Sequence, residues 1–169
     1  NTKKCDFADF GNSPFDYTRE KVEGKEIVFT TTNGTYAIEQ SRGCKTLLIG
    51  AFSNIDALAK KCIEIGERTV IICAGWNNRV NIEDTLFGGA FAEKLLIENP
   101  VNFDSDAVKI ALQLWQSAKH DPLNYIKDTE HYQRLIDNKA EGDASFCLQQ
   151  NTINLVPYYD RVEEKLKID

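Results

Sequence analysis

Two short segments carry side chains that could perform chemistry on a phosphate ester. One runs from Cys73 to Asp84 and ends in the adjacent carboxylates Glu83 and Asp84. Oxygen ligands of this kind suit Mg²⁺, which would bridge phosphate oxygens, neutralise charge and orient an attacking water. Two acids at the start of a helix also stabilise that helix without a metal, so a structural role competes with the metal site.

The second segment, Thr31 to Thr35, has the composition of an anion-binding turn. It reads Thr-Thr-Asn-Gly-Thr and is expected where a strand ends and a helix begins. Free backbone N–H groups at a helix start favour an anion by about 0.3–1 kcal/mol, and glycine lets the backbone approach a phosphate closely. A plain strand-to-helix turn capped by threonine or asparagine explains the same residues equally well.

Cys73 and Arg79 also have the Cys-x5-Arg spacing of cysteine-dependent phosphatases. In those enzymes a thiolate attacks phosphorus, so the reaction needs no metal. No serine or threonine follows Arg79, where such enzymes usually carry one, and no other feature supports this mechanism. It is the weaker alternative.

The cysteines and histidines give no pattern for a disulfide framework or a zinc site. The five cysteines form no Cys-x-x-Cys pair and their number is odd, which indicates reduced thiols. His120 and His131 are the two histidines, and neither has ligand spacing to the other or to a cysteine pair. His131 is expected to be a surface or boundary residue of a helix.

Alternating apolar runs and amphipathic stretches predict the elements that must position these groups. Strands are predicted at 25–31, 45–49 and 69–74. Helices are predicted at 35–41, 53–66, 81–95, 107–118 and 129–138, and a short edge strand at 154–159. The alternation implies a layered α/β fold with a mostly parallel sheet, and ligands bind at the carboxyl ends of the strands in such sheets.

Length and charge limit the class of protein. The 169 residues suffice for a single α/β domain, 1–169, that buries roughly 70% of its unfolded surface. A net charge of -6 argues against a nucleic-acid or membrane-surface binder. No apolar run approaches the roughly 20 residues of a membrane-spanning helix and no signal-peptide pattern is present, so a cytoplasmic location is expected. The start at Asn1 and the lack of methionine suggest a processed or trimmed chain.

Four separated motifs resemble the 2-phosphosulfolactate phosphatase family, in the order in which they occur there. They are Asp9 to Pro14 (DFGNSP), Thr31 to Thr35 (TTNGT), Gly50 to Asn54 (GAFSN), and Cys73-Ala74-Gly75 followed by Ile82 to Thr85 (IEDT). The likeness weakens after Pro100, although 143–147 and Val156-Pro157 resemble the closing segment of the family.

The resemblance implies a Mg²⁺-dependent hydrolase with a three-layer α/β/α fold and a mixed, mostly parallel sheet. Its partner would be a small anionic phosphate ester, and the implied reaction converts 2-phosphosulfolactate to sulfolactate and phosphate in coenzyme M biosynthesis. A related phosphorylated hydroxy acid is an alternative substrate, and a homo-oligomer is compatible with the sequence. Family members also carry an Asp-Val-Leu-Arg-Ala-Thr stretch before the first motif, which is absent here, so we expect a C-terminal portion that holds part of the site.

The motifs lead to a hypothesis about which residues form the active site. The residues expected to bind phosphate are Asn12, Ser13, Thr32, Asn33, Gly34 and Thr35. Glu83 and Asp84 are expected to hold Mg²⁺ or to act as acid and base, and the sequence does not rank one above the other.

The absent stretch would also have supplied an arginine. Arg19, Arg42 and Arg79 are its nearest replacements in this chain. A noncatalytic module that binds a phosphorylated ligand, or an incomplete fragment of the enzyme, is the competing interpretation.

Overall fold

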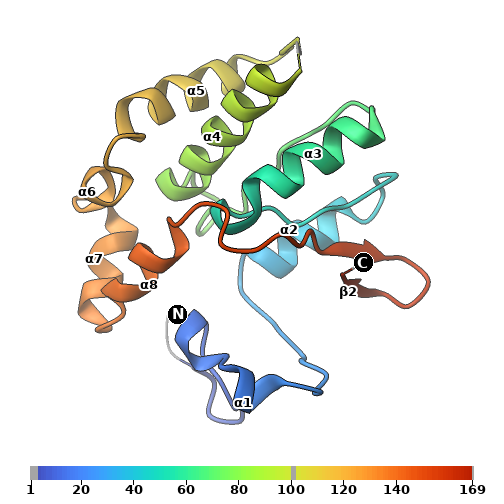
Figure 1. The fold of residues 1–169 in the computed structure, drawn as a ribbon. Coiled ribbons are helices and arrows are strands. Elements are labelled where there is room, and N and C mark those ends of the chain that lie inside the picture. The colour runs from blue at the N-terminus through green and yellow to red at the C-terminus, as the bar shows by residue number, and fades with distance from the viewer. Residues whose placement is uncertain (1–3, 100–101, 169) are drawn as a thin grey trace.

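A computed structural model describes residues 4–99 and 102–168, and helices dominate its regular structure (Figure 1). The helices are α1 (Arg19–Val22), α2 (Gly34–Ser41), α3 (Ile55–Ile65), α4 (Ile82–Glu98), α5 (Asp106–Ala118), α6 (Pro122–Ile126), α7 (Glu130–Asp137) and α8 (Glu141–Cys147). Two 3-10 turns, η1 (Pro14–Asp16) and η2 (Phe52–Asn54), and two strands, β1 (Tyr158–Asp160) and β2 (Lys165–Lys167), complete the regular elements.

The prediction of a three-layer α/β/α fold with a mixed, mostly parallel sheet is wrong. Within the described residues the sheet is a two-stranded antiparallel ladder, in which Tyr158 of β1 lies opposite Lys167 of β2. The expected strands at 25–31 and 69–74 form no ladder and leave Val28 and Val70 exposed to solvent. A β-branched run becomes a strand when a neighbour supplies backbone partners and covers its faces, and these two segments lack such a neighbour in the described structure.

The segment 45–49 comes closest to its predicted strand. Leu48 forms an antiparallel bridge with Tyr158, the Ile49 N–H donates to the Pro157 carbonyl (2.8 Å), and the Tyr159 N–H donates to the Leu47 carbonyl (3.0 Å). The C-terminal segment predicted as an edge strand therefore does pair through its backbone, with 47–49 on one side and β2 on the other.

The predicted helices are confirmed, because their signals are local. Gly66 ends α3 with a φ of 65°, Asn81 caps α4 by accepting the Asp84 N–H (3.2 Å), and Thr129 caps α7. The start of α3 differs slightly, since η2 precedes it and Asn54 occupies the cap position in place of Ser53. The short helices α6 and α8 were not predicted.

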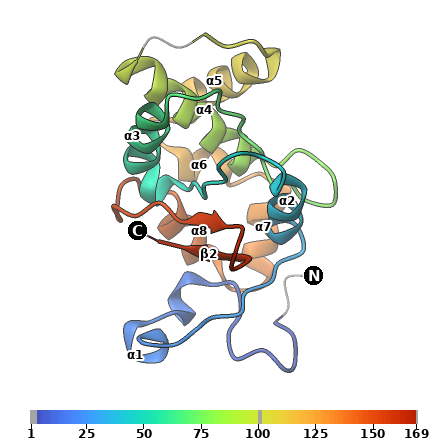
Figure 2. The same cartoon turned by 90° about the vertical axis from the view of Figure 1, so that its right-hand side faces the viewer.

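Helix α4 is the centre of the core. It packs against α5 and α3 at one end of the molecule, while the segment with α1 lies at the opposite end (Figures 1 and 2). The core residues are Phe52, Ile55, Leu58, Ala59, Leu86, Ala90, Phe91, Leu95, Trp115, Ala118, Ile126 and Ala144. A Cβ on Gly89 of α4 would lie 2.0 Å from the Ala111 carbonyl oxygen of α5, so the two helices approach as closely as their backbones allow.

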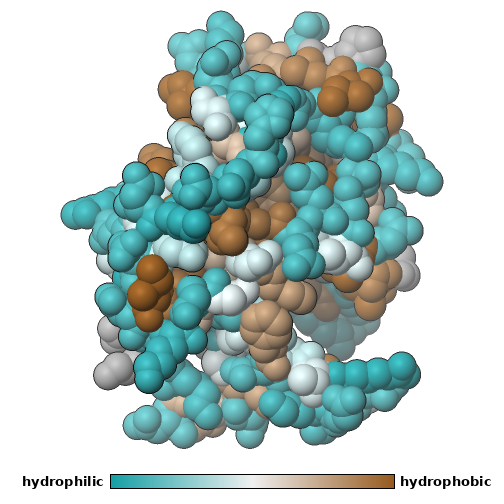
Figure 3. All heavy atoms as spheres, turned by 60° about the vertical axis from the view of Figure 1, so that its left-hand side comes forward, coloured by the Kyte–Doolittle hydropathy of each residue, from teal (hydrophilic) through white to brown (hydrophobic). Residues whose placement is uncertain are grey.

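The surface over α5 to α8 is mainly hydrophilic. Figure 3 shows its hydrophobic residues as separated patches among polar ones. None of the helices in the described ranges is both long and apolar enough to cross a membrane.

Asn54 joins two stretches of chain, 49–54 and the C-terminal segment, through one buried amide. Its Oδ1 accepts the Ala51 N–H (2.9 Å), and its Nδ2 donates to the carbonyls of Ile49 (3.1 Å) and Leu155 (2.9 Å). The residue is 3% exposed. The amide thus ties the C-terminal segment to the start of α3, which gives the Gly50 to Asn54 motif a structural role.

We expect Asn54→Ala to lower the free energy of unfolding by about 3 kcal/mol, because three backbone groups each lose a partner worth about 1 kcal/mol. Urea denaturation measures the change. The control is Asn124→Ala, which removes an exposed amide with a single side-chain contact from Lys127 and should change stability by less than about 0.5 kcal/mol. Equal stability of the two variants would show that the buried amide does not hold the segments together.

Candidate functional site

The loop before α4 is a tight hairpin. Trp76 and Arg79 pair through both backbone hydrogen bonds (3.0 and 2.9 Å), and Asn77 and Asn78 between them have φ values of 50° and 58°. Positive φ at both central residues is the geometry of a type I′ turn, which asparagine tolerates better than most residues. Gly75 has a φ of 66°, and a Cβ there would lie 2.6 Å from the Arg79 carbonyl oxygen, so the hairpin requires glycine.

Asp84 fastens this hairpin to the first turn of α4. Its Oδ2 accepts the Gly75 N–H at 2.6 Å, and its own N–H donates to Asn81. The Gly75 N–H therefore orients the carboxylate, while the backbone of Asp84 is held by the Asn81 cap. These contacts support the structural role at the start of α4 that the sequence allowed for Asp84. They also hold the Asp84 carboxylate beside the hairpin.

Glu83 is poorly satisfied by its surroundings. Its Oε1 lies 3.4 Å from the Thr129 hydroxyl, but that hydroxyl has a closer acceptor in the Ile126 carbonyl at 2.8 Å. Its Oε2 is buried and has no hydrogen-bond partner in the described structure. Because a buried carboxylate oxygen without a hydrogen bond is costly, Glu83, in the first turn of α4, is well placed to accept a cation or a hydrogen-bond donor.

Helix α7 covers the hairpin with Arg134. The guanidinium carbon lies 3.6 Å from the ring centroid of Trp76, in cation–π geometry, and Nη2 lies 2.9 Å from Nδ1 of His131. Nε and Nη1 of Arg134 are buried and have no hydrogen-bond acceptor among the residues that the structure describes. One carboxylate oxygen and two guanidinium nitrogens around the same loop thus lack hydrogen-bond partners among the described residues.

The other predicted site residues contact different parts of the molecule. Ser13 donates to Asp143 of α8 (2.7 Å), and Asn12 beside it is exposed. In the Thr31 to Thr35 turn the polar groups bond to one another, since Thr31 Oγ1 accepts the Thr35 N–H (3.3 Å) and the Thr35 hydroxyl donates to the Thr31 carbonyl.

That turn, with Thr32, Asn33 and Gly34, opens α2, which stands apart from α7 in Figure 1. Its internal hydrogen bonds are those of a structural turn. The phosphate-binding role of these three residues, and of Asn12, Ser13 and Thr35, stays a prediction.

Of the three arginines expected near the site, Arg79 lies in the hairpin, while Arg19 and Arg42 form ion pairs within other segments. Arg19 pairs with Glu23 (2.6 Å), and Arg42 pairs with Glu39 (2.8 Å) and stacks on Tyr159. Arg79 contributes its backbone to the hairpin and is exposed. Sequence reasoning missed Arg134, whose only local signal was its position three residues after His131 on a predicted amphipathic helix.

The environment of Cys73 disfavours the thiolate mechanism. Partial burial of the sulfur raises the pKa of the Cys73 thiol, and the carboxylate of Asp84 raises that pKa further. The sulfur also lies 3.5 Å from the Asp84 carbonyl. A raised pKa keeps the thiol protonated at neutral pH, whereas a nucleophilic cysteine needs a lowered one.

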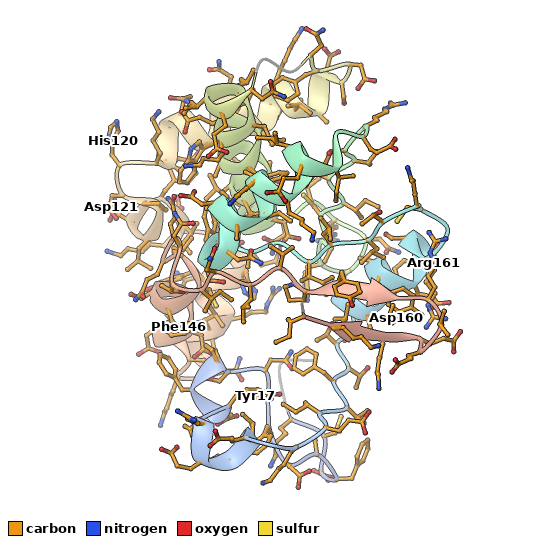
Figure 4. The ribbon with its side chains drawn as sticks, turned by 45° about the vertical axis from the view of Figure 1, so that its right-hand side comes forward. Tyr17, His120, Asp121, Phe146, Asp160 and Arg161 are labelled. Atoms are coloured by element: carbon orange, nitrogen blue, oxygen red, sulfur yellow. The ribbon has the colours of Figure 1, made fainter. Side chains whose placement is uncertain are left out.

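The histidines do not assemble a metal site. His120 lies with Asp121 at the outer edge of the molecule (Figure 4), while His131 lies against Arg134. No group of three or more histidine, cysteine or acidic side chains suited to a metal occurs in the described part of the chain. The oxygen donors that this part of the chain could offer to Mg²⁺ are the carboxylates of Glu83, whose Oε2 has no hydrogen-bond partner, and of Asp84. Mg²⁺ is commonly held by one or two carboxylates and completes its shell with waters and substrate phosphate.

Comparison with known proteins gives a family match over most of the chain. The profile described as 2-phosphosulpholactate phosphatase matches residues 1–161. A probable 2-phosphosulfolactate phosphatase of Clostridium botulinum strain Eklund 17B is 34% identical over 157 residues, which is 93% of this chain and 66% of that protein. One of Caldanaerobacter subterraneus is 34% identical over 158 residues (93% and 65%), and one of a Cyanothece species is 31% identical over 160 residues (92% and 66%). The chain thus spans slightly less than two thirds of the length of these relatives.

Proposed function

Because the chain belongs to the 2-phosphosulfolactate phosphatase family, we propose that it contributes the active site for hydrolysis of a small anionic phosphate monoester. The first candidate substrate is 2-phosphosulfolactate, which gives sulfolactate and phosphate, and a related phosphorylated hydroxy acid is the second. The observation that carries the proposal is the Oε2 of Glu83, which is buried without a hydrogen-bond partner on the residue that precedes Asp84 in the first turn of α4.

Glu83 and Asp84 are the residues that would hold Mg²⁺. When bound, the ion would neutralise phosphate oxygens and lower the pKa of a coordinated water. Asp84 supplies a carboxylate whose orientation is set by the Gly75 N–H, so little side-chain freedom is lost on binding. Glu83 supplies an oxygen that gains its first strong partner when a cation binds.

Family membership alone supports the finer assignments. For 2-phosphosulfolactate the reaction would be a step of coenzyme M biosynthesis, and we place it in the cytoplasm. The net charge of -6 supports local recognition of an anion by individual cationic groups, since the chain as a whole would repel one.

The test is phosphate release from a panel of phosphorylated hydroxy acids that includes 2-phosphosulfolactate, with Mg²⁺ and with EDTA. We expect release with Mg²⁺, loss of release in EDTA, and recovery when Mg²⁺ is restored. The full-length Clostridium botulinum relative serves as the positive control for each ester. Phosphate release that is insensitive to EDTA would refute the Mg²⁺ dependence of the reaction. Binding of these esters without hydrolysis would identify the chain as a binding module.

A further inference from the structure

We infer that Arg134, held on the face of Trp76, is the oxyanion-binding residue of this site and grips the phosphoryl group of the ester. The inference rests on the proposed function for the identity of the ligand. Its structural basis is that two buried guanidinium nitrogens of Arg134 have no hydrogen-bond acceptor among the described residues. The binding of an anion to them can be measured without turnover.

The guanidinium is held in place but not satisfied. Stacking on Trp76 at 3.6 Å fixes its plane, and the contact of Nη2 with His131 fixes its rotation. The carboxylate of Glu130 lies 3.7 Å from Nη1, beyond hydrogen-bond distance, on a side chain that is 67% exposed. Nε and Nη1 therefore remain buried donors without an acceptor.

Other arginines of this acidic chain behave differently. Arg19, Arg42 and Arg68 each form an ion pair with a carboxylate at 2.6 to 2.9 Å, on side chains that are 40% to 81% exposed. Arg134 is the more buried at 20% exposure, yet its nearest carboxylate contact is longer. Burial makes an unmatched charge more costly, so this arrangement is stable when an anion supplies the acceptor.

Glu83 points to the kind of anion. The Arg134 and Glu83 side chains both lie at the contact between α7 and the segment formed by the hairpin and the start of α4. Arg134 of α7 stacks on Trp76 of the hairpin, and Glu83 of α4 contacts Thr129 at the start of α7. They form no ion pair with each other within the described residues. A ligand that offers anionic oxygens to the guanidinium and a bound cation to the carboxylate satisfies both groups at once, and a phosphate with Mg²⁺ is such a ligand.

The stacking on Trp76 explains why position 134 is an arginine and not a lysine. A planar guanidinium can stack on an indole while its edge donates hydrogen bonds, whereas a lysine ammonium has neither the plane nor the directed edge. Arg134→Lys should therefore bind the oxyanion less well although the charge is kept.

The experiment is calorimetric titration of inorganic phosphate, in Mg²⁺, into the wild-type chain and into Arg134→Ala, Arg134→Lys and Arg42→Ala. We expect the phosphate affinity to fall about 10- to 100-fold in Arg134→Ala and less in Arg134→Lys, the size of one or two charge-assisted hydrogen bonds. Arg42→Ala is the matched control, because Arg42 also stacks on an aromatic ring, that of Tyr159, and should leave the affinity unchanged. Circular dichroism checks folding, and Arg134→Gln replaces Arg134→Ala if the latter unfolds.

Unchanged phosphate affinity in Arg134→Ala, or no phosphate binding by the wild-type chain, would overturn the inference. A parallel titration with methanesulfonate separates the two oxyanions of a sulfonated ester, since a loss confined to methanesulfonate would overturn the phosphoryl assignment in favour of the sulfonate. The outcome is independent of turnover: phosphate binding that depends on Arg134 without hydrolysis of any ester refutes the proposed function alone. Turnover with an unchanged KM in Arg134→Ala refutes the inference alone.

Discussion

Replacing Asp84 with asparagine should reduce phosphate release at least about a hundredfold while the chain stays folded. The asparagine Oδ1 can still accept the Gly75 N–H, so the hairpin keeps its anchor on α4. What disappears is the negative charge that would hold Mg²⁺ or accept a proton. Initial rates of phosphate release across a Mg²⁺ series measure the loss, and thermal unfolding confirms that the scaffold is intact.

Asp121→Asn is the matched control for this substitution. Asp121 also accepts a backbone N–H at a helix start, that of Asn124 at 3.0 Å, but it lies at the outer edge of the molecule (Figure 4). Its replacement should leave turnover unchanged. Normal activity and normal Mg²⁺ dependence in Asp84→Asn would remove Asp84 from the site and leave it with the structural role alone.

Adding a single methyl group at Gly89 should cost about 3 kcal/mol of stability. The Cβ of an alanine would meet the Ala111 carbonyl oxygen at 2.0 Å and the Trp115 Cβ at 2.8 Å, so α5 must move away from α4. That movement also disturbs the Trp115 indole, which donates to Glu93 of α4 at 2.6 Å. Denaturant unfolding of Gly89→Ala gives the change in the free energy of unfolding.

The neighbouring glycine provides the control. A Cβ on Gly88 would meet nothing closer than 3.9 Å outside its own helix, so Gly88→Ala should be neutral or stabilising by up to about 1 kcal/mol through helix propensity. The two variants share chemistry, helix and sequence context and differ in what the methyl group meets. Equal stability of the two would mean that α4 and α5 do not approach as closely as described.

The helices could be predicted because their signals are contained in a few consecutive residues. The cap at Asn81, the left-handed stop at Gly66 and the apolar spacing of 107–118 each act within one or two turns. The sheet could not be predicted in the same way, because β-branched runs at 25–31 and 69–74 form strands only where other segments pair with them. Family resemblance reinforced the expectation of a parallel sheet that the described residues do not form.

For the candidate site, the sequence indicated residues within short stretches but not the contacts between distant stretches. Glu83 and Asp84 are adjacent in the sequence, so both lie in the first turn of α4 as expected, but neighbouring residues of a helix do not face each other. The metal-binding role of the two carboxylates stays a prediction. The stacking of Arg134 on Trp76 joins residues that are distant in the sequence, and no local pattern records it. The contact forms only where α7 packs against the hairpin.

The close approach of α4 and α5 also bears on the order in which the chain folds. These two helices follow each other along the chain, so bringing them together closes a short loop and loses little chain entropy. The pairing of 47–49 with Tyr158 and Tyr159 instead closes a loop of most of the chain. Contacts between sequence neighbours generally form faster than distant ones, so we expect the helical pair to form early during refolding. We expect the C-terminal pairing, with the Asn54 amide that secures it, to form late.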